Sequence, residues 1–182
     1  MTGEPEADNE QRSRRRAALL GASAGLRSQA PIAVLIHSLR DGRIQLDRQD
    51  MDRWLCDSRA ERIAMAAAVG ELIVDKLPFV PARTKPGPFA GRLIFGGLAG
   101  YLGASSSNGS SRSGALAGAA AAGVTATAGT TLRATLPRVT GYPKFAVAIA
   151  EDVLAFVVAT YAIRTDRPGK REHLNTDDAH PL

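Results

Sequence analysis

Apolar residues fall into long runs along this chain, and charged residues fall between the runs. Five stretches have a length close to what a helix needs to cross a bilayer. They cover residues 17–39, 60–80, 89–104, 114–136 and 145–163. Turn-forming residues separate them, such as the Ser/Asn/Gly stretch 105–113 and the prolines between 137 and 143. The pattern predicts an all-α fold, a polytopic membrane bundle of about five Ala/Gly-rich helices.

The hydrophilic ends of the chain lie outside this pattern. Residues 1–16 are acidic and then basic without apolar periodicity, which predicts a disordered tail. Residues 164–182 are polar and give the same prediction. Residues 17–163 between them form the predicted membrane domain.

Composition alone resembles that of a soluble protein, since charged residues make up 23% of the chain. The net charge of +5 comes from clusters that flank the apolar runs. Contact with anionic lipid therefore explains these clusters better than contact with nucleic acid. We expect a multi-pass protein of the inner membrane that has the lipid bilayer as its partner, with self-association into a homo-oligomer as a further prediction and no nucleic-acid partner.

Basic residues near the ends of the stretches bear on orientation. The cluster at residues 12–16, together with Arg83 and Lys85, favours a cytoplasmic N-terminus, because basic loops tend to stay inside. Five crossings would then place the basic residues after 163 outside, against the same rule. A first stretch that is broken or re-entrant near residues 27–31 removes this conflict.

Alanine and glycine take the place of leucine in these stretches. Helices in lipid associate through close backbone approach and dispersion, which small residues allow. Small residues recur at a spacing of four in three stretches, and we expect them at helix contacts. They are Gly21, Gly25, Gly96, Gly100, Gly114 and Gly118. An Ala-rich soluble bundle is the alternative, although residues 114–132 carry no charge for a polar stripe.

Ionisable residues lie inside the apolar stretches, where each charge costs about 2.5–3.5 kcal/mol at the centre of a bilayer. The stretch 145–163 shows the size of the effect. Its nine Phe, Val, Leu and Ile residues contribute roughly −4.5 kcal/mol, whereas Glu151 and Asp152 cost about +6 kcal/mol. Partner charges, protonation or water must therefore offset the two acids.

The charges together predict a polar centre inside the bundle. Glu71 and Asp75 lie four residues apart on one helix face that also carries alanines. Arg27 and Arg133 are the expected partners of the acids. The predicted set is Arg27, Glu71, Asp75, Arg133, Glu151 and Asp152. Lys76 and Arg92 would balance its charge if they reach inward.

One short element occurs twice. Leu-Arg followed by Pro four residues after the Arg spans residues 26–31 and again residues 132–137. An apolar helix with two acids follows each copy. Two stretches, then one, then two would place such copies in opposite orientations, as in transporters with inverted repeats.

Several of these residues form a pattern that resembles a known family. The pattern is Gly-Leu-Arg-x-x-x-Pro, then Glu-x-x-x-Asp-Lys-Leu-Pro, then Arg-x-x-x-Gly-Gly, then a late Glu-Asp. It resembles the bacterial integral membrane family of domain of unknown function 4126, over roughly residues 19–159. The residues that carry it are Arg27, Pro31, Glu71, Asp75, Lys76, Pro78, Arg92, Gly96, Arg133, Glu151 and Asp152. The resemblance implies an integral membrane location and no established activity.

Three classes of function are compatible with these features. A small transporter or channel-like protein would use the polar centre for a proton, a cation or a polar solute. A structural protein would use the same charges to lock helix packing. A membrane enzyme acting on lipids is the third class, but the three histidines are scattered, and the single Cys56 excludes an intramolecular disulfide. We expect no catalytic residue, metal or cofactor.

Overall fold

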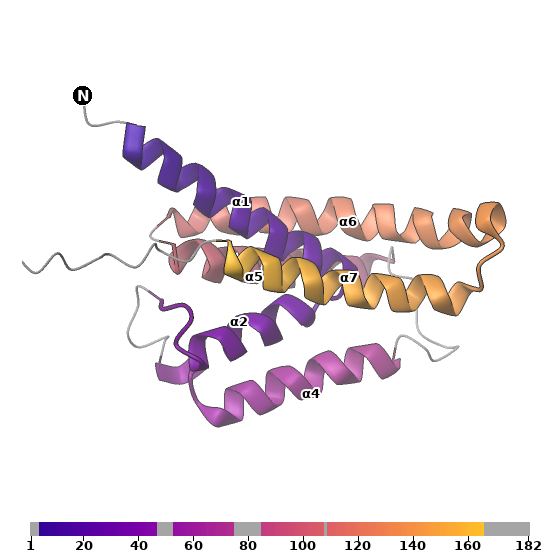
Figure 1. The fold of residues 1–182 in the computed structure, drawn as a ribbon, viewed down its shortest axis with the longest axis horizontal. Coiled ribbons are helices and arrows are strands. Elements are labelled where there is room, and N and C mark those ends of the chain that lie inside the picture. The colour runs from indigo at the N-terminus through magenta and orange to yellow at the C-terminus, as the bar shows by residue number, and fades with distance from the viewer. Residues whose placement is uncertain (1–3, 47–52, 75–84, 108, 166–182) are drawn as a thin grey trace, which may run out of the picture.

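The computed structural model describes residues 4–46, 53–74, 85–107 and 109–165. All regular structure in these ranges is helical, which confirms the all-α part of the prediction (Figure 1). The helices are α1 (Glu4–Leu26), α2 (Ala30–Arg40), α4 (Ser58–Val74), α5 (Pro86–Ser105), α6 (Ser111–Thr140) and α7 (Lys144–Arg164).

Helix α1 lies at the centre of the bundle and packs against α5, α6 and α7. Its second half carries small and apolar residues that are fully buried, namely Ala17, Leu20, Ser23 and Ala24. Helix α2 packs on α7 and α4, and α4 forms the outer edge (Figure 1). The second half of α1 is therefore enclosed by three other helices.

The predicted first stretch is broken. Helix α1 ends at Leu26 and α2 begins at Ala30, with Pro31 in the first turn of α2, where its missing N–H costs nothing. Helix α1 enters from the end of the molecule that holds the N-terminus, and α2 returns toward that same end (Figure 1). Residues 17–39 therefore form a hairpin of two helices and not one crossing.

The prediction of a disordered tail over residues 1–16 is wrong for residues 4–16, which belong to α1. Ion pairs at the spacing of one helical turn support this extension: Arg12 to Asp8 at 2.7 Å and Arg14 to Glu10 at 3.0 Å. Ser13 and Arg16 are also buried, at 1% and 3% exposure. Of the second predicted tail, residues 166–182 lie outside the described residues.

Helix α6 continues through Pro137, where the sequence predicted its end, and stops at Thr140 before Gly141, which has a φ of +72°. Pro137 has no N–H to donate to the carbonyl of Arg133 and its ring crowds that carbonyl, yet the helix continues for three more residues. The second Leu-Arg-x-x-x-Pro element therefore leaves its helix intact. Because α1 and α6 also run in the same direction (Figure 1), the two copies of this element are not inverted relative to each other.

All six glycines that the sequence placed at helix contacts lie where α1, α5 and α6 approach one another. A Cβ added to Gly118 would lie 2.9 Å from the Cα of Gly100, and one added to Gly21 would lie 2.5 Å from the Cα of Gly118. Real Cβ contacts essentially never fall below 3.0 Å. The same crowding surrounds Gly25, Gly96 and Gly114. The backbones of the three helices are thus too close for any side chain at these positions.

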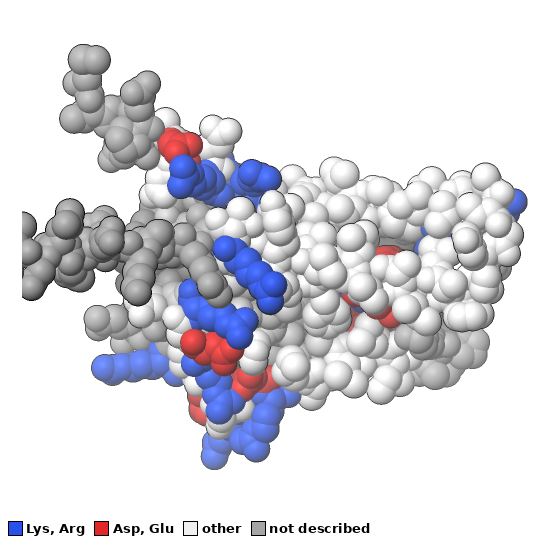
Figure 2. All heavy atoms as spheres, in the orientation of Figure 1, with Lys and Arg blue, Asp and Glu red and all other residues white. Residues whose placement is uncertain are grey.

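The surface divides into a charged end and an apolar body. Most Lys, Arg, Asp and Glu atoms visible in Figure 2 gather at one end, and the rest of that face is mostly uncharged. Among the described residues, two helices are long and apolar enough to cross a membrane, namely α6 and Phe145–Arg164 of α7.

Candidate functional site

Arg27 follows the last residue of α1 and is 2% exposed. Its Nε donates to Oδ1 of Asp152 at 2.6 Å, and its Nη2 donates to the same oxygen. One turn away, the Ser23 hydroxyl donates to the carbonyl of Ala155 at 2.8 Å. An ion pair and a neutral hydrogen bond thus join the end of α1 to the middle of α7.

Arg92 of α5 binds the C-terminal end of α1. Its Nη1 donates to the carbonyl of Gly25 at 2.8 Å and to that of Leu26 at 3.0 Å. The last carbonyls of a helix lack partners within that helix, and a cation there is favoured by the helix dipole. Since Arg92 is only 3% exposed, this interaction takes place inside the bundle.

Glu71 of α4 binds the opposite side of the same break. Its two carboxylate oxygens accept from the backbone N–H groups of Ser28 and Gln29, each at 2.9 Å. These groups precede α2, where a negative charge is favoured by the helix dipole. Oε1 of Glu71 also lies 3.8 Å from Nη2 of Arg92. The break between α1 and α2 is therefore capped on both sides by opposite charges from other helices.

A second ion pair joins α6 to α7. Nε of Arg133 donates to Oε2 of Glu151, and Glu151 is only 8% exposed. The other oxygen of Glu151 lies over Gly129 of α6, so that a Cβ there would be 3.3 Å from it. Since Glu151 precedes Asp152, the two pairs meet on one turn of α7.

The structure brings five of the six predicted residues together and adds Arg92. We define the charge centre as Arg27, Glu71, Arg92, Arg133, Glu151 and Asp152. It holds three arginines and three carboxylates, so its formal charges balance. Asp75, Lys76 and Pro78 lie outside the described residues.

The sequence analysis included Arg92 in the polar centre only conditionally, although its spacing from two glycines of α5 indicates an inward position. It precedes Gly96 by four residues and Gly100 by eight, which puts all three on one face of α5. That face packs inward. What the sequence did not indicate is that the backbone of Ser28 and Gln29 would supply the partners of Glu71.

A separate polar cluster lies at the charged end and ties α2 to α4. Nδ1 of His37 lies 2.9 Å from Oε1 of Glu61, and Arg40 donates to the other oxygen. The Glu61 carboxylate thus links two side chains of α2 to α4.

The charge centre keeps six ionisable groups in balance at the broken helix. Of these groups, Glu71 and Arg92 bind the backbone at the break, whereas Glu151 and Asp152 bind arginine side chains. No group of three or more His, Cys, Asp and Glu within the described ranges is placed to hold a metal ion.

Comparison with known proteins bears on the whole of this region. No curated protein and no solved structure matches the chain. A family model described as a domain of unknown function (DUF4126) matches residues 16–165, which include every residue of the charge centre. The chain therefore belongs to the family of domain of unknown function 4126.

Proposed function

We propose that the protein is a multi-pass protein of the inner membrane, in which α4 to α7 cross the bilayer and α1 and α2 form a re-entrant pair. Large apolar side chains stand exposed on all four proposed crossings, and soluble monomers rarely leave so much apolar surface in water. Examples are Ile63 and Ile73 of α4, Ile94 of α5, Leu116 and Val124 of α6, and Val153 and Val157 of α7.

The dimensions of the helix pair support the re-entrant part of the proposal. Helix α2 has 11 residues and rises about 16 Å, which is roughly half the hydrocarbon thickness of a bilayer. Irregular backbone at that depth is tolerated only where protein surrounds and satisfies it. Arg92 and Glu71 supply that satisfaction at the break.

The distribution of charge supports one orientation. Arg12, Arg40 and Arg164 belong to the charged end, where α1 starts and where α2 and α7 finish (Figures 1 and 2). Basic residues favour the cytoplasmic side, so both ends of the helical domain would face the cytoplasm. Lys85 directly precedes α5 at the opposite end of the molecule. It would therefore face away from the cytoplasm, whereas the five-crossing prediction placed it on the cytoplasmic side. Four crossings remove the conflict at the basic C-terminal residues.

Single-cysteine labelling tests this topology. In a Cys56→Ser background, we would introduce cysteine at Ser106, Tyr142 or Thr165 and label intact cells with a membrane-impermeant maleimide. We expect labelling at Tyr142 before lysis, and at Ser106 and Thr165 only after lysis. Labelling of Tyr142 on the same side as Thr165, or release of the protein by a carbonate wash, would reject the proposal.

The function that this geometry supports best is passage of a proton or a small cation, with the charge centre as the site. The observation that carries it is the capped break: in transporters with discontinuous helices, the two helix ends bind the substrate and the coupling ion. Arg92 and Glu71 occupy these two places here. A proton on Glu71 would weaken the hydrogen bonds that this carboxylate accepts from the backbone. A cation at the Gly25 carbonyl would compete with Arg92 for that oxygen.

A structural role is the second candidate, favoured by the same ion pairs. Each residue of the charge centre has a partner of opposite charge or a helix end, so the network can fix helix positions without moving an ion. On this view, loss of one charge lowers stability and alters no flux.

Flux measurements separate the two candidates. Proteoliposomes with a pH-sensitive dye inside would receive a proton gradient, and parallel samples a Na⁺ or K⁺ gradient with matching dyes. We expect faster relaxation than in protein-free vesicles and a large loss of that rate in Asp152→Asn, with no loss in Arg112→Gln at the exposed start of α6. Equal rates in wild-type and protein-free vesicles for all three ions would leave the structural role.

A further inference from the structure

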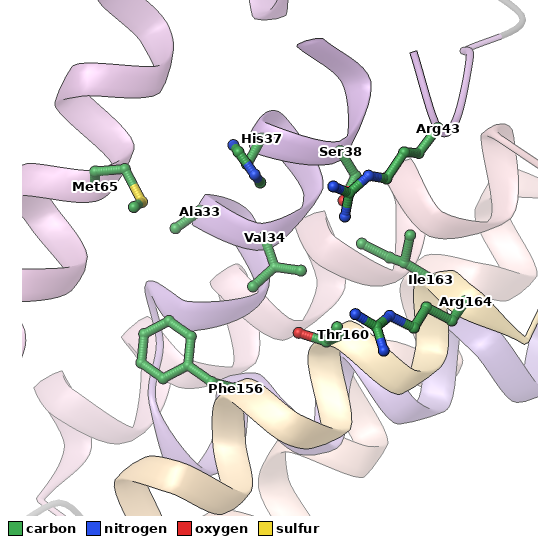
Figure 3. Close-up of a pocket in the computed structure, with 10 residues that line it drawn as sticks. All are labelled: Ala33, Val34, His37, Ser38, Arg43, Met65, Phe156, Thr160, Ile163 and Arg164. Carbon is green, nitrogen blue, oxygen red and sulfur yellow. The ribbon is translucent and has the colours of Figure 1, made fainter. Parts of the chain in front are cut away.

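A pocket of about 160 Å³ opens between α2, α4 and α7 (Figure 3). Val34 of α2, Met65 of α4 and Phe156 and Thr160 of α7 line it. It lies apart from the charge centre, none of whose residues forms its wall. Neither ion passage nor helix locking makes use of it.

The two ends of this pocket differ in chemistry. Arg43 and Arg164 lie at one end, and Phe156 and Met65 lie at the other (Figure 3). Phe156 precedes Arg164 by eight residues, so the apolar end is about 12 Å farther along the axis of α7. A molecule that fills the pocket therefore contacts two arginine side chains at one end and apolar side chains at the other.

The charged end of the pocket favours an anion. Two of its lining residues are arginines, and the described residues that line it include no carboxylate. Nη2 of Arg43 pairs with Asp41 outside the lining at 2.9 Å, yet the Arg43 side chain stays 43% exposed. Arg164 forms no ion pair with any residue that the structure describes. The hydroxyl of Thr160 adds a neutral hydrogen-bonding group beside them.

We propose that this pocket seats one anionic phospholipid, with its phosphate against Arg43 and Arg164 and the first part of one acyl chain along Thr160 and Phe156. The inference rests on the proposed membrane location, which places the charged end at the lipid headgroups. The pocket volume of about 160 Å³ is below the range that encloses a drug-sized ligand, about 300–1,000 Å³. A whole phospholipid does not fit inside this volume, so its acyl chains would extend from the pocket into the surrounding lipid.

Lipid retention in detergent tests the proposal. The full chain, purified in a neutral detergent, would be mixed with phosphatidylglycerol or phosphatidylcholine of identical acyl chains, and bound lipid counted by native mass spectrometry. We expect preferential retention of phosphatidylglycerol, with a loss of about fivefold for each of Arg43→Gln and Arg164→Gln. Thr160→Phe keeps both charges and fills the pocket, so it should reduce retention of both lipids.

The matched control is Arg112→Gln, which removes one exposed arginine from the same end of the molecule but not from the pocket. We expect it to leave retention unchanged. Equal retention of the two lipids by the wild type, or unchanged retention in the double glutamine variant, would overturn the proposal. Displacement of the lipid by millimolar inorganic phosphate would instead identify a site for free anions. Because the measurement is made in micelles, release of the protein by carbonate would reject the membrane topology without deciding this result.

Discussion

Glu71 and Arg92 cap the two sides of one helix break with opposite charges. Glu71 accepts from the N–H groups of Ser28 and Gln29 before α2, and Arg92 donates to the carbonyls of Gly25 and Leu26 at the end of α1. Each side chain compensates for backbone groups that a continuous helix would have satisfied by itself. The break thus depends on α4 and α5, although it lies between α1 and α2.

Replacement of Glu71 tests this dependence. Glu71→Gln keeps one acceptor oxygen and loses the charge, whereas Glu71→Ala leaves both N–H groups without their acceptor, at about 1–3 kcal/mol for each unsatisfied group. Thermal unfolding in detergent should therefore rank the variants as wild type, then Gln, then Ala. Asp8→Asn, at an exposed acid of α1 far from the break, is the control for loss of a carboxylate. An alanine variant as stable as the wild type would show that the break needs no cap from α4.

The ion pair between Arg27 and Asp152 predicts strong thermodynamic coupling. Breaking a buried ion pair by removal of one partner typically costs about 3–5 kcal/mol. We expect Arg27→Ala with Asp152→Ala to cost clearly less than the sum of the single changes, in free energies of unfolding from reversible SDS titration. The crossed cycle of Arg133 with Asp152 should show weaker coupling. If both cycles were additive, the charges would act as separate groups.

Close approach of α5 and α6 predicts opposite effects for two glycines of α5. A Cβ at Gly100 would lie 2.9 Å from the Cα of Gly118 on α6, whereas a Cβ at Gly91 would meet nothing within 4 Å. Gly100→Ala should therefore lower stability by about 1–3 kcal/mol, and Gly91→Ala should raise it by up to about 1 kcal/mol through helix propensity.

A leucine comparison extends this test. Gly100→Leu should lower the melting temperature more than Leu98→Ala, because Leu98 is 44% exposed and makes few contacts to lose. If the leucine truncation proved the more damaging change, the small-residue face would not be the main packing surface.

The local pattern of residues was sufficient to predict most helices and to identify the buried charged residues. The apolar runs predicted α4 to α7 closely, because a run of apolar residues with helical spacing depends only on neighbours in sequence. The spacing of Gly96 and Gly100 likewise marked one face, and that face lies against α6. The family resemblance also followed from short motifs, and the family match over residues 16–165 confirms it.

Tertiary structure decided where a helix breaks and which charges pair. The same Leu-Arg-x-x-x-Pro element breaks the chain after Leu26 but not at Pro137. The difference lies in partners distant in sequence, since Glu71 and Arg92 reach only the first copy. The pairing of Arg27 with Asp152 likewise joins residues that are distant in sequence. Local sequence indicates which polar groups need a partner, but only packing brings that partner within hydrogen-bond distance.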